Sequence, residues 1–231
     1  RELAEMMMGA NINRPTRKKN TKSSSPSLEV MDLSINPKEA MGVSLREISL
    51  TVSGGEILGI AGLAGNGQSE LMEQLSGEAL ANNAESIQLS GISVGKMGPL
   101  ERREMGLCYI PEERMGHGAV PDLTLWENAF LSAMDRKKLS KGGFINIQKS
   151  RSFSESVVKR FKVKGGGVEQ SASSLSGGNL QKYIVGREIA QDPIVLIALQ
   201  PTWGVDAGSA AAIHKEIVNL AEKGTAVLII S

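Results

Sequence analysis

Apolar residues along the chain fall into short runs that are separated by glycine-rich or polar turns. Runs of strand length occur at residues 28–34, 45–52, 56–61, 87–89, 107–110, 194–199 and 225–230. Stretches with helical spacing of apolar residues lie between them, at 69–75, 100–105, 124–131, 147–161, 176–189 and 210–222. Because strands alternate with helices, the pattern predicts an α/β fold with a largely parallel sheet that helices cover.

The runs differ in how polar residues interrupt them. Residues 45–52 place their apolar side chains imperfectly on one face, which is typical of a half-buried strand. Residues 56–61 and 194–199 are short and apolar, which is typical of buried parallel strands. Residues 135–143 are polar, and we expect a surface loop there.

The two ends of the chain predict a piece of a longer protein. The chain begins inside a predicted helix, residues 2–8, without a capping residue before it, and it stops directly after a predicted strand. Residues 10–27 contain two prolines, a serine run and five basic residues, and they lack hydrophobic periodicity. This composition predicts a solvated basic linker between domains, with a nucleic-acid-binding arm as the alternative.

Composition narrows the classes of function. The 231 residues suffice for one domain with a sizeable core, and a net charge of +1 excludes a strong overall attraction to nucleic acid or to a membrane surface. No run reaches the roughly 18 apolar residues of a membrane span, so any membrane role has to come through a partner chain. Cys108 is the one cysteine, which excludes an internal disulfide and suits a reducing compartment; we expect it to be a small buried hydrophobic residue.

A candidate phosphate-binding loop follows the strand predicted at 56–61, where a glycine-rich turn leads into a helix. Residues 62–69 fit the pattern G-x-x-x-x-G-K-[ST], except that Gln68 occupies the place of the lysine. Glycines let backbone N–H groups face phosphate oxygens, and the Ser69 hydroxyl is the predicted Mg²⁺ ligand. Gln68 can donate a hydrogen bond but carries no charge. A glycine turn without a ligand is the alternative. The predicted nucleotide-binding residues of the loop are Gly62, Gly65, Asn66, Gly67, Gln68 and Ser69.

Residues 175–182, Leu-Ser-Gly-Gly-Asn-Leu-Gln-Lys, resemble the signature motif of ATP-binding-cassette proteins. In physical terms the motif is a helix N-terminus whose serine hydroxyl and glycine N–H groups can meet a γ-phosphate. The alternative, a capped helix with glycines in its turn, accounts for Ser176 but not for the whole octet. The resemblance implies a P-loop NTPase of the ATP-binding-cassette type over residues 28–231, truncated before its C-terminal end. Such a domain has a mixed, largely parallel sheet and a helical subdomain, here at about 115–190.

The resemblance also assigns roles to later positions. A hydrolytic cassette ends the strand at 194–199 with aspartate, which holds Mg²⁺, and continues with glutamate, which polarises the attacking water. Leu199 and Gln200 stand at those positions here. Leucine holds no metal, and glutamine can orient water without accepting its proton. Asp206 matches the D-loop aspartate, with a helix cap as the alternative. Glu112 matches the Q-loop glutamine, which senses Mg²⁺ and couples a cassette to its membrane subunit.

One element that most cassettes contain is absent from this sequence, and the position of a second lies beyond its last residue. No Phe, Tyr or Trp precedes Tyr109, so no aromatic side chain upstream of the phosphate loop is available to stack on adenine. The switch histidine would fall beyond Ser231. We expect His117 and His214 to be surface residues.

Several motifs together resemble the second nucleotide-binding domain of tandem cassettes that serve nucleoside and simple-sugar uptake. The residues that carry the likeness are 59–62, 68–71, 111–114 and 200–202, and the likeness covers nearly all of 28–231. Residues 101–103 and 116–121 resemble the nucleoside branch more closely. Residues 1–9 then look like the tail of a first domain. Leu180 and Trp203 are departures, because the family usually has Gln and Arg there.

The resemblance implies that two cassettes pair head to tail, and that this signature motif contacts ATP bound to the first domain of the same polypeptide. The signature residues concerned are Ser176, Gly177, Gly178 and Gln181. Gln68, Leu199 and Gln200 would form a second site that binds nucleotide weakly or holds it unhydrolysed, so we expect this domain alone to be a weak or inactive ATPase. The expected cofactors are ATP and Mg²⁺. The expected partners are membrane permease subunits and, indirectly, an external solute-binding lipoprotein, with no nucleic acid. The expected location is the cytoplasmic face of the cell membrane.

Other functions stay open from the sequence alone. They are a tandem cassette ATPase without a membrane partner, a nucleotide-sensing regulatory module, and a P-loop kinase. Tandem cassettes outside transport usually keep lysine and glutamate in both halves, and residues 175–182 have no role in a kinase. The permease and the external binding protein select the solute, so this domain does not identify it.

Overall fold

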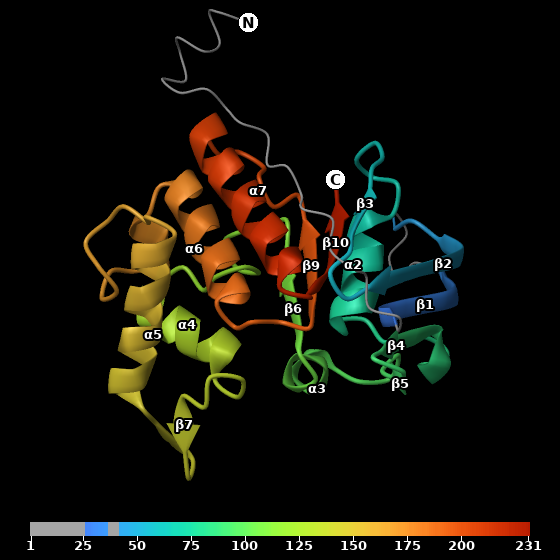
Figure 1. Cartoon of the computed structure of the whole chain (residues 1–231), viewed down its shortest axis with the longest axis horizontal. Coiled ribbons are helices and arrows are strands. Elements are labelled where there is room, and N and C mark those ends of the chain that lie inside the picture. Colours follow the sequence, from blue (N-terminus) through green and yellow to red (C-terminus); the bar gives the residue numbers. More distant parts are fainter. Residues whose placement is uncertain (1–25, 37–41) are drawn as a thin grey trace, which may run out of the picture.

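The computed structural model describes residues 26–36 and 42–231, which fold around a central sheet (Figure 1). The predicted tail at 1–9 and most of the predicted linker at 10–27 lie outside the described residues. No helix within the described part of the chain is long and apolar enough to cross a membrane.

The central sheet is parallel, as the alternation of strands and helices predicts. Its order is β3 (Ile57–Ile60), β10 (Ala226–Ile230), β9 (Val195–Leu199) and β6 (Leu107–Ile110). All three pairings run parallel. Every residue of β9 is buried, which agrees with the apolar run at 194–199.

A second sheet is antiparallel, and its strands come mainly from the N-terminal part of the chain. Its order is β2 (Leu45–Ser53), β1 (Pro26–Ile35), β4 (Ile87–Leu89) and β5 (Ile92–Ser93). Helix α2 (Gln68–Ser76) shares one hydrophobic core with both sheets. The core buries one face of β2 only, so the imperfect alternation at 45–52 is that of a half-buried strand.

The opposite face of the parallel sheet packs against helices, and the helical lobe extends sideways from there (Figure 1). Its helices are α4 (Leu125–Ala133), α5 (Ile147–Arg160) and α6 (Gly177–Ile189), while α7 (Ala207–Glu222) covers the sheet. Shorter elements are α3 (Pro99–Glu104) and the single-turn 3₁₀ helices η1 (Ala84–Ser86) and η2 (Ala172–Ser174). Cys108 is fully buried in this core, and burial raises the pKa of its thiol to about 12.

Two segments differ from the sequence-based expectation. Part of the predicted loop at 135–143 belongs to a hairpin of β7 (Ser140–Lys141) and β8 (Phe144–Ile145). Gly142 and Gly143, both at positive φ (59° and 81°), make the two-residue turn that suits a tight hairpin. Helix α7 begins at Ala207 rather than at residue 210, because the Asp206 carboxylate accepts a hydrogen bond from Ser209 N at 2.9 Å and caps the first turn.

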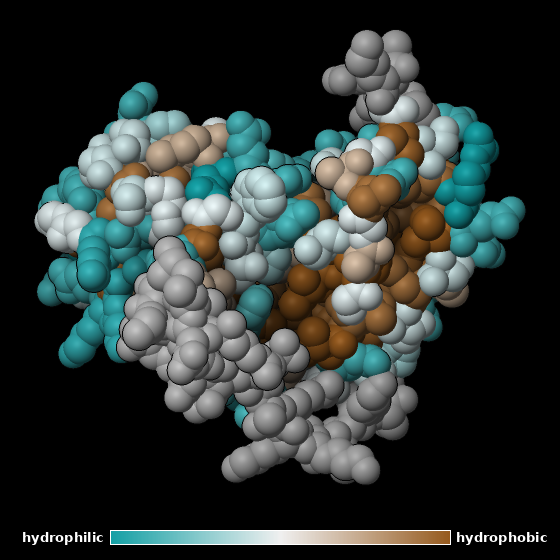
Figure 2. All heavy atoms as spheres, turned by 90° about the horizontal axis from the view of Figure 1, so that it is seen from above, coloured by the Kyte–Doolittle hydropathy of each residue, from teal (hydrophilic) through white to brown (hydrophobic). Residues whose placement is uncertain are grey.

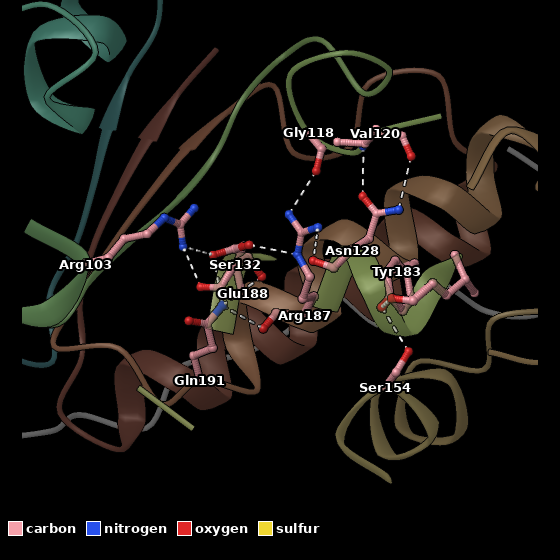
Figure 3. A network of polar contacts seen from close by, with 11 residues as sticks. Arg103, Gly118, Val120, Asn128, Ser132, Ser154, Tyr183, Arg187, Glu188 and Gln191 are labelled. Carbon is pink, nitrogen blue, oxygen red and sulfur yellow. Dashed lines mark hydrogen bonds and ion pairs between the residues drawn. The ribbon is translucent and has the colours of Figure 1, made fainter. Parts of the chain in front are cut away.

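A buried carboxylate in α6 connects the helical lobe to the sheet (Figure 3). Glu188 is fully buried, with Arg103 Nη1 2.8 Å from Oε2 and Arg187 Nε 2.9 Å from Oε1. Arg187 also donates to the Gly118 carbonyl at 2.8 Å. Burial alone would raise the pKa of Glu188, but the Arg103 and Arg187 guanidiniums outweigh it and hold this pKa below its ordinary value. The network fixes α6 to α3 and to the segment that follows β6.

Glu188→Gln is expected to destabilise the fold by about 3 kcal/mol at neutral pH, because it leaves two arginines without a buried counter-charge. The folded-state pKa of Glu188 lies below 4.5, so its contribution is present above that pH and is lost as the pH falls through the folded-state value. Urea unfolding at pH 7 and at acid pH measures the difference. The exposed Glu155→Gln in α5 is the matched control. A difference between variant and parent that stays constant at acid pH would contradict this account.

Candidate functional site

The candidate site lies at the edge of the parallel sheet where β3, β6 and β9 end, because parallel strands place their carboxyl ends together. One pocket there is lined by Ser69 after β3, by Glu112 and His117 after β6, and by Leu199 at the end of β9. Three predicted segments that are distant in sequence therefore meet. Figure 2 shows this side of the molecule, whose surface is hollowed between the helical lobe and the part that contains the antiparallel sheet.

The loop after β3 contains left-handed glycines and leads directly into a helix. Gly65 and Gly67 have φ values of 83° and 97°, which favour glycine, and a Cβ on Gly67 would lie 2.6 Å from Leu45 Cδ2. Helix α2 begins directly afterwards, so its N-terminus and the Ser69 side chain lie beside the loop. These features fit a phosphate group.

The Gln68 side chain changes what this loop offers to a ligand. Its Nε2 donates to the Leu63 carbonyl at 2.8 Å, and its Oε1 accepts from Asn66 N at 3.0 Å. The Gln68 amide thus pairs with one of the loop's own N–H groups, that of Asn66. The Gln68 side chain provides hydrogen bonds within the loop and no positive charge for a polyphosphate.

The surroundings of Ser69 do not fit a hydrolytic magnesium site. Leu199 is 4 % exposed and presents no ligand atom at the end of β9. No group of three His, Cys, Asp or Glu side chains that could hold a metal ion occurs within the described residues. Glu73, Glu78 and Glu113 join Glu112 in the pocket, whose described lining contains no lysine or arginine. A nucleotide polyphosphate would meet like charges there.

Gln200 closes the carboxyl end of β9. Its backbone is left-handed, with φ 50°, and its N–H donates to the Ile230 carbonyl at 2.9 Å. Ser231 Oγ donates to Gln200 Oε1 at 3.3 Å, and Ser231 O accepts from Gly62 N at 3.0 Å. Gln200 therefore lies close to the start of the phosphate loop, where an amide can orient a water molecule but accepts no proton from it.

His117 and Glu78 are pocket residues that the sequence did not reveal. His117 is partly exposed, as expected of a surface residue, but its Nε2 lies 2.6 Å from Glu78 Oε1, and both side chains line the pocket with Ser69. Tyr109 Oη donates to the same Glu78 oxygen at 3.0 Å, since burial raises the pKa of Tyr109 to about 12 and keeps it protonated. Glu78 and His117 are 39 residues apart in the sequence, so no local sequence pattern pairs them.

The signature segment forms the N-terminus of α6. Ser176 occupies the N-cap position, but its hydroxyl makes no capping hydrogen bond. Instead Asn179 Nδ2 donates to Ser176 Oγ at 3.0 Å. Leu175 and Leu180 are buried on either side, which leaves Ser176 and Gly177 exposed to solvent. The positive end of the helix dipole is thus accessible to an anion from outside the molecule.

Gln181 lies inside the domain rather than on its surface. It is 2 % exposed, its Nε2 donates to the Pro201 carbonyl at 2.8 Å, and its Oε1 accepts from Arg114 Nε at 3.0 Å. Arg114 Nη2 also donates to the Trp203 carbonyl. Both ends of the Gln181 amide are therefore bonded within the chain.

Asp206 acts as a helix cap, which is one of its two sequence-based interpretations. Besides the bond from Ser209 N, its Oδ2 accepts from Ser209 Oγ at 2.6 Å, and these bonds hold the pKa of Asp206 below its ordinary value. The Trp203 side chain, three residues earlier, is 64 % exposed.

Comparison with solved structures identifies the fold. An ATP-binding cassette in a dimeric, post-hydrolysis state bound to ADP and Pi superposes with a TM-score of 0.74 over 88 % of this chain and 87 % of that one, at 20 % identity. A nucleotide-free cassette from an ABC transporter gives a TM-score of 0.69 over 89 % and 81 %, also at 20 % identity. The fold is that of an ABC ATPase, a P-loop NTPase with a parallel sheet and a helical part.

The family model described as ABC transporter matches residues 45–202, and the chain belongs to this family. It is 38 % identical over its whole length to the nucleoside import ATP-binding protein NupA of Lactococcus lactis and 36 % identical to the guanosine import ATP-binding protein NupO of Bacillus subtilis. A ribose import ATP-binding protein of Jannaschia is 36 % identical over 80 % of this chain. The matches cover 45 %, 45 % and 35 % of these relatives, so the chain spans less than half of their length.

Asp206→Ala is expected to cost about 1 kcal/mol of stability, because it removes the cap of α7, whereas Asp206→Asn keeps a capping oxygen and costs only tenths of that. Chemical denaturation of the three proteins measures the difference. Asp122→Ala removes a carboxylate of similar exposure elsewhere and is the control. Equal stabilities for the Ala and Asn variants would show that the cap contributes nothing.

Proposed function

We propose that this chain is a cassette of an ABC importer for nucleosides or simple sugars, and that its signature motif completes the ATP site of a partner cassette. In this proposal its own site has lost hydrolytic chemistry. The observation that carries the proposal is a contrast between two places in one domain. The N-terminus of α6 is intact and open at Ser176 and Gly177, whereas Gln68 and Leu199 replace the charged groups of the loop and of β9.

The importer part of the proposal rests on the relatives. NupA is described as a nucleoside import and NupO as a guanosine import ATP-binding protein, and both match this chain over its full length. Ribose and glucose import proteins match at 36 % and 33 % identity, which keeps simple sugars in the proposal. The partners we propose are permease subunits, an external solute-binding lipoprotein acting through them, and no nucleic acid. The protein would lie peripherally at the cytoplasmic face of the membrane.

The proposed partner cassette is a first nucleotide-binding domain of the same polypeptide. The support is that this chain accounts for about 45 % of relatives such as NupA, which leaves room for a second domain of similar size. Residues 28–231 would then be the second domain, with 1–9 as the tail of the first and 10–27 as the linker. Gln181 would support the signature motif from inside, since its amide is bonded within the chain.

The cofactors we propose are ATP and Mg²⁺, used productively at the partner's site. At this chain's own site, the loop backbone and Ser69 would hold phosphate weakly, because Gln68 supplies no charge and four glutamates line the adjoining pocket. Leu199 leaves the metal without its usual carboxylate, and Gln200 accepts no proton. The Glu112 segment borders the same pocket, as the Q-loop assignment requires. The D-loop assignment of Asp206 is compatible with its role as the cap of α7. The segment at 200–206, which contains Asp206, borders the signature helix through the hydrogen bond from Gln181 to the Pro201 carbonyl.

Ser176→Glu in the full-length polypeptide is expected to lower ATP hydrolysis about 100-fold, because it places a negative charge and a bulky side chain where the partner's γ-phosphate would bind. Gln200→Ala is expected to leave the rate within about twofold, because hydrolysis does not use this chain's own site. Steady-state phosphate release by the reconstituted importer measures both. Ser152→Glu, an equal change of charge on the exposed side of α5, is the control. A fast ATPase that Gln200→Ala abolishes would refute the proposal.

Gln68→Lys is expected to raise the affinity of this chain's own site for ATP about tenfold, because it restores a charge-assisted bond to the phosphates. Hydrolysis at this site should remain absent, since Leu199 and Gln200 are unchanged. Binding of a fluorescent ATP analogue measures the affinity, with Gln68→Glu as the opposite-charge control, for which we expect weaker binding. No difference between the Lys and Glu variants would show that the loop does not bind phosphate.

A further inference from the structure

Arg114 joins three segments that lie far apart in the sequence. It follows β6 in the segment that begins at Pro111, and its Nε donates to Gln181 Oε1 in α6 at 3.0 Å. Its Nη2 donates to the Trp203 carbonyl in the turn after β9. The side chain is thus bonded both to the signature helix and to the turn at 200–206.

Two glycines allow the guanidinium to lie this close to the backbone. A Cβ on Gly177, the first residue of α6, would lie 2.8 Å from Arg114 Nη1. A Cβ on Gly204 would lie 2.7 Å from Nη2, and Gly204 also has a positive φ of 61°. Any larger residue at either position would displace the guanidinium, so the glycines serve the close approach of this side chain.

These hydrogen bonds form one connected network. Gln181 links Arg114 to Pro201, because its Oε1 accepts from Arg114 while its Nε2 donates to the Pro201 carbonyl at 2.8 Å. Gln181 is 2 % exposed, so water does not easily replace these bonds. Trp203 N in turn donates to the Gln200 carbonyl at 3.0 Å, which closes the turn that Arg114 holds.

We propose that Arg114 is a positioning residue that locks the N-terminus of the signature helix to the turn at 200–206, so that both move as one body. The inference rests on the proposed function, in which these two segments face the partner cassette. Arg114 acts through the Gln181 side chain in the signature helix and through the Trp203 carbonyl in the turn. A planar guanidinium with several donors can make these bonds at once, whereas a lysine amine keeps the charge but not the fork geometry.

Hydrogen–deuterium exchange in the full-length polypeptide tests the lock directly. In Arg114→Lys, amide exchange in residues 200–206 is expected to be about tenfold faster, because the turn loses charge-assisted hydrogen bonds while the local charge is kept. Arg160→Ala, which removes an exposed ion pair with Glu216 on the far part of α7, should leave exchange at 200–206 unchanged. Exchange in Arg114→Lys equal to that of the parent would overturn the inference.

The variant Gln181→Met tests the same connection if Arg114→Lys folds poorly. Gln181→Met preserves the shape of the buried side chain but removes both of its bonds, so it should also accelerate exchange at 200–206. The double variant should exchange no faster than the more affected single variant, since both changes break one connection. Additive effects on exchange would mean that Arg114 and Gln181 act separately, which would overturn the inference. Thermal unfolding midpoints report whether each variant is folded.

Steady-state ATP hydrolysis separates this inference from the proposed function. Arg114→Lys should lower kcat about tenfold with KM for ATP changed less than twofold, because the residue orders the signature and does not bind the nucleotide. Suppose that Arg114→Lys exchanges faster at 200–206 with an unchanged kcat, and that the separate Ser176→Glu variant also remains active. These two results together would support the lock and refute the proposed function. Unchanged exchange with a lowered kcat would refute the lock alone.

Discussion

The structure depends on the burial of β9 and β10 at the centre of a parallel sheet. Every residue of β9 is buried, and the strand lies between β10 and β6, so its register is determined by side chains that pack on both faces. Parallel pairing then brings the carboxyl ends of β3, β6 and β9 to one edge. The phosphate loop, the segment containing Glu112 and the turn containing Gln200 lie together for this reason alone, whatever chemistry their side chains retain.

Contacts within the chain hold the backbone in place at this edge of the sheet. The loop keeps its left-handed glycines and the helix start that follows, while the Gln68 amide satisfies an N–H and a carbonyl of the loop itself. Leu199 packs into the hydrophobic core. The cassette fold therefore depends on apolar burial, whereas any chemistry at this edge of the sheet depends on a few polar residues.

Polar residues do have a structural role elsewhere, where they fix the segments that border the site. Glu188 binds two arginines in a buried network between α6, α3 and the segment at Gly118. Arg114 and Gln181 connect the same helix to the turn after β9. Helix α6 is thus held at both ends. Directional bonds of this kind set the position of a helix more narrowly than hydrophobic packing does.

The sequence by itself determined most of the helices and strands and the parallel central sheet, because hydrophobic periodicity and glycine spacing are local properties of the chain. It did not predict the β7–β8 hairpin or the separate antiparallel sheet. The prediction that Leu199 and Gln200 stand at the positions of a catalytic Asp and Glu also comes from the sequence alone, through the resemblance to cassettes. Only the tertiary structure decided that Gln68 folds onto its own loop, that Ser176 does not cap its helix, and that His117 meets Glu78. The Gln68 and Ser176 contacts are local, but they depend on the exact backbone geometry of a loop and of a helix start. The His117 to Glu78 contact joins segments that are 39 residues apart. The spacing of residues along the chain encodes neither.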